Sequence, residues 1–233
     1  MTYLGFVLSA MVTDYYPRLT SVIKDHAAAR RLINEQTEIS ILLCAPVVVG
    51  LLAFSPWVIR LLYTSEFVPA VDILRWQLLG DIFKVICWPI GFIQQASGAA
   101  KTLFVTETFA MGTYLAVVYF GLPIIGISAT GVAFLIQYVL LLIVIWCLAR
   151  RRIEFQWTRA VRIQAIAVIL SAAAVVGSSR SSELLGAAVG GVLAAIMLVW
   201  ALLRISSLAA AGGRFGRVAT MGDKVTGWLR SRL

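Results

Sequence analysis

Six residues that could do chemistry lie along one face of an otherwise apolar segment, 73–98. They follow alternating spacings of four and three residues, and they are Gln77, Asp81, Lys84, Trp88, Gly91 and Gln95. In a helix with about 3.6 residues per turn, this spacing places all six on one line, which we call the polar stripe. An ionised side chain at the centre of a membrane helix costs about 2.5–3.5 kcal/mol. We therefore expect the stripe to face water or a partner group rather than lipid.

Asp81 and Lys84 are three residues apart, so they can form an ion pair within one helix. In one interpretation the pair lines a path through the membrane, which is the usual meaning of ionisable residues inside a span. In the other, the two charges neutralise each other and staple neighbouring helices together. The residues alone leave both interpretations open.

Three further polar residues lie outside the stripe and are interpreted one by one. Arg18 lies in the motif DYYPRL, beside two tyrosines of the kind found at membrane interfaces, and the favoured interpretation is that it fixes the orientation of the helix in the membrane. The alternative is that its planar guanidinium group faces a cavity and binds a phosphate. Glu107 is predicted to be an acid at a helix N-terminus, where the helix dipole favours it. Gln137 is either an interhelical hydrogen-bonding residue or a ligand-binding group.

Several kinds of chemistry are excluded by what the chain lacks. His26 is the only histidine, and the three cysteines, Cys44, Cys87 and Cys147, all lie in apolar stretches. A histidine-ligated metal cluster or a Ser-His-Asp triad therefore has little to be built from. We therefore expect no enzyme activity, no metal and no cofactor.

The elements that must position these residues are transmembrane helices. The 233 residues are 61% hydrophobic and 13% charged, against roughly 45–50% and 25% in soluble domains. Seven apolar segments are predicted, at 1–13, 39–62, 73–98, 102–121, 129–149, 163–178 and 184–204. Because the backbone in lipid must satisfy its own hydrogen bonds, the predicted fold is all-α, a polytopic transmembrane helix bundle with about seven spans. Gly186 and Gly190 form a small-residue face that favours close helix contact.

The basic residues predict an orientation. Across alternate connections, 16 lysines and arginines fall on one side of the membrane and 3 on the other, with Lys84 inside. Basic loops stay in the cytoplasm, so the N-terminus is predicted outside and the C-terminus inside. The net charge of +9 is explained by this topology and does not indicate a nucleic-acid partner. The basic segment 206–233 is either a solvated tail or a helix on the surface of anionic lipid.

Three stretches carry a family resemblance: YYPRLT (15–20), FVPAVDILRWQLLGDIFKVICW (67–88) and KTLFVTET (101–108). Together they resemble the polysaccharide transport family of the multidrug/oligosaccharidyl-lipid/polysaccharide flippase superfamily, in particular Wzx-type O-antigen translocases and the lipid III flippase. On this basis residues 1–155 resemble the C-terminal bundle of a MATE-like flippase. Residues 156–205 would add two transmembrane helices, and 206–233 would form the cytoplasmic tail.

The resemblance implies translocation of an undecaprenyl-pyrophosphate-linked oligosaccharide, such as an O-antigen repeat unit, across the bacterial inner membrane. Lys84 would contact the phosphate, and Asp81 would orient it or take part in cation coupling. Gln77 and Gln95 would bind sugar hydroxyls, and Trp88 would stack on a sugar ring.

The resemblance also makes Arg18 a candidate cavity residue. Its implied partners are the lipid-linked oligosaccharide, membrane lipids, and either a polysaccharide polymerase or an N-terminal bundle that the family has and this chain lacks. The chain is then expected to be the C-terminal portion of a longer protein. The alternative is a non-transporting membrane scaffold, or an inactive fragment that associates with polysaccharide-assembly partners.

Overall fold

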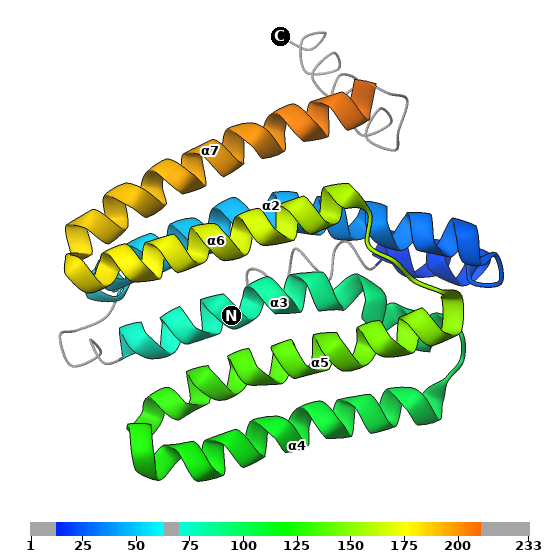
Figure 1. Ribbon diagram of the computed structural model, residues 1–233, viewed down its shortest axis with the longest axis horizontal. Coiled ribbons are helices and arrows are strands. Elements are labelled where there is room, and N and C mark those ends of the chain that lie inside the picture. The colour runs from blue at the N-terminus through cyan, green and yellow to red at the C-terminus, as the bar shows by residue number, and fades with distance from the viewer. Residues whose placement is uncertain (1–12, 63–69, 211–233) are drawn as a thin grey trace, which may run out of the picture.

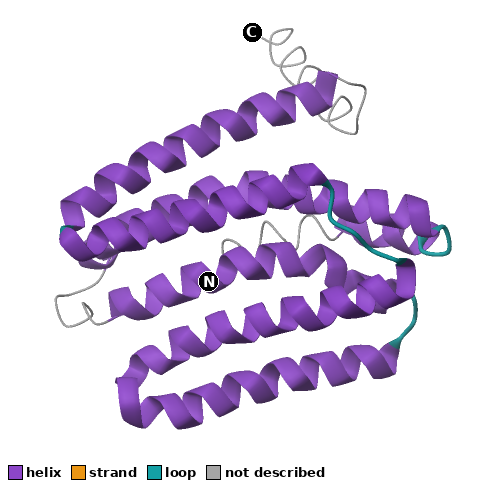
Figure 2. Cartoon of the chain, in the orientation of Figure 1, coloured by secondary structure: helices purple, strands orange, loops and turns teal. Residues whose placement is uncertain are grey.

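The computed structural model describes residues 13–62 and 70–210, and over these ranges all regular structure is helical (Figures 1 and 2). Residues 13–22 are helical. They are followed by α2 (His26–Leu62), α3 (Ala70–Ala96), α4 (Ala100–Ile125), the short 3-10 helix η2 (Gly126–Ser128), α5 (Ala129–Ile153), α6 (Arg159–Ser181) and α7 (Glu183–Ala210). The predicted all-α fold is confirmed. The predicted tail lies largely outside the described residues.

The predicted number of spans is wrong: the described residues hold five helical segments long and apolar enough to cross a membrane, not seven. They are His26–Leu61, Ala70–Ala96, Ala100–Ile153, Arg159–Ser181 and Glu183–Ser207. The predicted spans 102–121 and 129–149 fall within the single stretch Ala100–Ile153, because helical backbone continues through η2 where the chain turns back. The predicted segment 1–13 lies outside the described residues except for its last residue. Because the described residues include five such apolar helical segments, the chain is a multi-pass membrane protein.

The first described connection is much shorter than the sequence predicted, because α2 begins well before the apolar segment at 39. The Asp25 carboxylate accepts hydrogen bonds from the backbone N–H groups of Ala27 at 3.0 Å and Ala28 at 3.1 Å. This N-cap satisfies two donors that the first turn would otherwise leave open. After His26, the next five residues are three alanines and two arginines, which are strong helix formers. The polar stretch therefore folds as an extension of α2.

The helices lie roughly side by side in a row that runs from α4 through α5, α3 and α2 to α7 (Figure 1). Helix α6 packs against both α2 and α7. Consecutive helices run in opposite directions, so α2, α4 and α6 all begin at one end of the bundle. We call this the basic end, because Arg30, Arg31, Lys101, Arg150, Arg151, Arg152, Arg159 and Arg162 lie there. Helices α2 and α3 form the centre, and α4 is the outer helix on one side.

Small residues set the packing of α7. A Cβ atom at Gly190 would collide with Cβ of Ala53 on α2, and one at Gly186 would collide with the Ser179 side chain on α6. The small-residue face predicted from the sequence therefore lies at two helix contacts. Without these glycines α7 could not approach its neighbours so closely.

Two ion pairs join α2 to α7 at opposite ends of the bundle. Glu38 Oε1 lies 2.9 Å from Arg204 Nε at the basic end, and Glu183 Oε2 lies 3.0 Å from Arg60 Nη1 at the other. The 22 residues from Glu38 to Arg60 rise about 33 Å along a helix, close to the roughly 30 Å thickness of a hydrocarbon core. The two pairs are thus separated by about the thickness of a hydrocarbon core.

Candidate functional site

The charged pair of the polar stripe lies where α3 faces α5. Lys84 Nζ is 4.0 Å from Asp81 Oδ1, and 5.6 and 5.7 Å from the ring centroids of Phe134 and Tyr138. The Asp81 side chain is 11% exposed, whereas the Lys84 side chain remains 24% exposed. A carboxylate and two ring faces therefore hold the ammonium group while it stays accessible.

Two glycines bring α3 and α5 together at this point. A Cβ atom at Gly80 would lie 2.5 Å from Cδ1 of Phe134, and one at Gly131 would lie 2.8 Å from the carbonyl oxygen of Ile73. Both distances are shorter than normal carbon contacts. Gly80 comes one helical turn before Lys84, so the close approach of the two helices places the Phe134 ring beside the lysine.

A cavity of about 210 Å³ opens between α3, α4 and α5, on the face of α3 that carries Lys84. Its walls combine an ammonium group, a carboxylate, amides and aromatic rings. It is lined by Lys84, Cys87, Trp88, Gly91, Phe92, Gln94, Gln95, Leu103, Thr106, Glu107, Gln137, Tyr138, Leu141 and Ile145. A polar space of this size has room for several water molecules or for a small ligand group.

The structure brings part of the predicted site into this cavity. Three of the candidate residues line it, namely Lys84, Trp88 and Gln95, as does the stripe glycine Gly91. The Trp88 ring packs edge-on against Phe92, with centroids 5.2 Å apart. Asp81 lies behind Lys84 and does not line the cavity. The two charges of the stripe thus have different surroundings: one is buried, and the other faces the cavity.

Gln77 and Arg18 are not among the residues that line the cavity. Gln77 is half-buried on α3, about two turns before Lys84. Arg18 Nη1 lies 3.7 Å from Asp14 Oδ2 within the helical segment 13–22. That segment packs on α3 through Tyr15, whose hydroxyl donates to the Pro89 carbonyl oxygen at 2.8 Å. The roles of Gln77 and Arg18 remain predictions from the family resemblance.

Glu107 is the carboxylate that lines the cavity, and the sequence-based interpretation of it is wrong. Helix α4 begins at Ala100, so Glu107 lies beyond its first turn, where the helix dipole no longer has much effect. It lines the cavity between α3, α4 and α5 and is itself exposed. The available sequence signal was the spacing of Leu103, Glu107 and Ala110, which places the carboxylate on the same side of α4 as the buried Ala110.

A buried hydrogen bond fixes α4 to α3 beside the cavity. Thr106 Oγ1 donates to Gln94 Oε1 at 3.0 Å, and both side chains are buried. Neither residue is among the site residues predicted from the sequence. Within residues 13–62 and 70–210, no three His, Cys, Asp or Glu side chains lie close enough to bind a metal ion.

Asp81 and Lys84 lie deep within the span. Arg75 Nε donates to Ser55 Oγ at 3.3 Å, which sets the register between α3 and α2. Ser55 is five residues, or about 7.5 Å, below Arg60, and Asp81 is six residues, or about 9 Å, beyond Arg75. Asp81 is therefore roughly 16–17 Å from the level of Arg60, about halfway between the levels of the two ion pairs that join α2 to α7.

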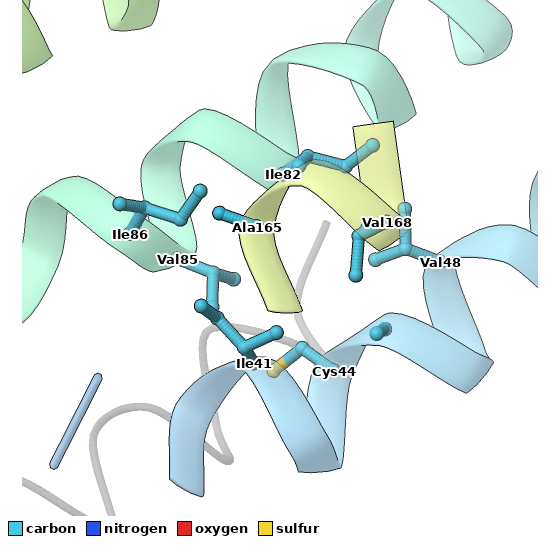
Figure 3. Close-up of a pocket in the computed structure, with 9 residues that line it drawn as sticks. Ile41, Cys44, Val48, Ile82, Val85, Ile86, Ala165 and Val168 are labelled. Carbon is cyan, nitrogen blue, oxygen red and sulfur yellow. The ribbon is translucent and has the colours of Figure 1, made fainter. Parts of the chain in front are cut away.

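The opposite face of α3 is apolar. Figure 3 shows a small void between α2, α3 and α6, of about 10 Å³ and lined only by aliphatic side chains and Cys44. Ile82, Val85 and Ile86 of α3 point into this void. The two faces of α3 thus separate a packed apolar seam from the polar cavity, and Lys84 lies on the polar side.

Comparison with known proteins gives one distant relative. A protein of Shigella flexneri named "Putative O-antigen transporter" is 27% identical over 139 residues, which cover 59% of this chain and 33% of that protein. The match thus spans about a third of the length of the curated relative. No family model and no solved structure matches the chain. The chain is a helical membrane protein with distant, partial homology to this protein.

Proposed function

We propose that the chain takes part in moving a lipid-linked oligosaccharide across the bacterial inner membrane, and that the cavity between α3, α4 and α5 accepts part of it. The observation that carries the proposal is the polar cavity deep in an apolar bundle, with Lys84 open to it. The distant likeness to a protein named as an O-antigen transporter supports the same class of cargo. The basic end would face the cytoplasm.

Lys84 is the residue proposed to bind the phosphate of the cargo. Its ammonium group is 4.0 Å from Asp81, a long contact that a phosphate with a higher charge can replace. Asp81 would then act as a positioning residue, because it holds the free ammonium group at the cavity wall. Trp88 and Gln95 would contact sugar, and the prenyl tail would remain in lipid while helix movements expose the cavity to each side in turn.

A chromosomal Lys84→Ala substitution tests this proposal in the organism that encodes the chain. Surface polysaccharide is expected to be lost, while immunoblots of the membrane fraction show an unchanged amount of protein. The matched control is Lys101→Ala, which removes an exposed lysine at the start of α4 and outside the cavity lining. Normal export in the Lys84 variant would overturn the proposed phosphate contact.

The second candidate function is a membrane scaffold, and the burial of Asp81 against Lys84 favours it. In a scaffold the pair would staple α3 to α5, and polysaccharide-assembly enzymes would dock elsewhere. Loss of export together with loss of protein from the membrane in the Lys84 variant would support this function.

A further inference from the structure

We propose that Glu107 determines the specificity of the cavity by selecting sugars that carry a basic amino substituent. This inference rests on the proposed function, because it assigns a cargo class to the same cavity. Lys84 on α3 would bind the phosphate of such a sugar, and Glu107 on α4 would bind its ammonium group. The cavity would thus recognise a phosphorylated amino sugar by opposite charges on two walls.

The first argument is that Glu107 lacks a charged partner. It makes no ion pair with any residue in the described ranges, whereas Lys84 has Asp81. Glu107 lies seven residues into α4, about 10 Å along the helix from its start. Glu107 is exposed, and it lines the cavity, so its carboxylate is open to a cation there.

The second argument is the arrangement of the two charges. Lys84 and Glu107 line one cavity from different helices, and they do not form an ion pair with each other. A ligand with a single negative charge would satisfy only the α3 wall. A ligand with a phosphate at one position and an ammonium group at another satisfies both walls through charge-assisted hydrogen bonds.

The third argument is the chemistry of the remaining lining. Gln95 and Gln137 offer amide donors and acceptors, and Trp88 and Tyr138 offer ring faces. Sugar rings present hydroxyl groups at their edge and C–H groups on their faces, so these side chains suit a sugar. Asp81 is buried outside the lining, which leaves Glu107 to contact an amino group.

The test uses the full 233-residue chain in lipid nanodiscs and ligand-observed NMR titration. The probes are glucosamine 1-phosphate, glucose 1-phosphate and glucosamine. Glucosamine 1-phosphate is expected to bind roughly tenfold more tightly than glucose 1-phosphate, because it forms one additional hydrogen bond between charged groups. Glu107→Gln keeps the side-chain shape and should abolish this preference. Lys84→Gln should weaken both sugar phosphates to a similar degree.

Glu35→Gln is the matched control, because Glu35 is an acid near the basic end that pairs with Arg31 and does not line the cavity. It should leave the preference unchanged. Equal binding of the two sugar phosphates, or a preference that survives Glu107→Gln, would overturn the inference. The phosphate contact of Lys84 would still stand if Lys84→Gln weakens the binding of both sugar phosphates. Glucosamine binding that depends on Glu107 but not on Lys84 would support the inference. Sugar-phosphate binding that is unchanged by Lys84→Gln would overturn the phosphate contact. If none of the probes binds, both are refuted.

Discussion

Gly131 sets the distance between α3 and α5, so Gly131→Ala is expected to destabilise the bundle next to the cavity. The added Cβ atom would lie 2.8 Å from the Ile73 carbonyl oxygen and 3.2 Å from Ile73 Cα. Both are backbone atoms, so no side-chain rotation relieves the contact. The helices must separate by about 0.7 Å to reach normal contact distance. Overpacking of this kind costs about 1–3 kcal/mol.

In a protein of this size, that cost lowers the melting temperature by roughly 2–12 °C. The assay is thermal unfolding of the purified protein in detergent, followed by size-exclusion chromatography of the heated samples. Gly112→Ala on α4 is the matched control, because no atom lies within 4 Å of the Cβ position there. It should leave stability unchanged or raise it by up to about 1 kcal/mol. A melting temperature in Gly131→Ala equal to that of the parent would refute the reasoning that glycine holds α3 against α5.

Two further predictions concern contacts between helices. Glu38→Arg should destabilise the bundle by about 1–3 kcal/mol, because it places two cations together at a contact where the Glu38 side chain is 12% exposed. Adding Arg204→Glu restores opposite charges and should recover most of the lost stability. A double variant no more stable than the single one, as measured by thermal unfolding, would contradict an ion pair at this place. Thr106→Val should cost about 1–3 kcal/mol because it leaves the buried Gln94 oxygen without its donor; an unchanged melting temperature would show that the hydrogen bond is dispensable.

Sequence reasoning identified the helical fold and the stripe on α3, because both follow from the period of the helix and from the cost of polar groups in lipid. Lys84, Trp88 and Gln95 share a face at regular spacing, and the structure does bring them to one cavity. The sequence alone did not show that Asp81 is buried while Lys84 faces the cavity. The spacing places both on one stripe, whereas burial depends on α5, which crosses α3 at Gly80 and is far away in sequence.

The errors have a common physical origin. Glu107 and the start of α2 were interpreted from local composition, but helix ends depend on caps and packing as well. Asp25 caps α2 and draws a polar stretch into the helix, and α4 starts early enough to place Glu107 beyond its first turn. The sequence also predicted a break between the spans 102–121 and 129–149. Helical backbone instead continues through η2 up to α5.

The geometry of Asp81 and Lys84 is unfavourable for a pure staple. A staple gains most when both charges are sealed and at close range, and even then apolar residues of similar size are often equally stable or better. Here the charges are 4.0 Å apart, and one of them remains accessible near the middle of the span.

The double variant Asp81→Leu/Lys84→Met should therefore keep or raise the melting temperature while polysaccharide export stops. Leucine would extend the apolar packing of α3 at the buried position, and methionine would keep a flexible side chain against the Phe134 and Tyr138 rings. The measurements are thermal unfolding in detergent and surface polysaccharide in cells. A decrease of several kcal/mol in the free energy of unfolding of the double variant would mean that the pair holds the helices together. The proposed role of Lys84 in binding phosphate in the cavity would then be rejected.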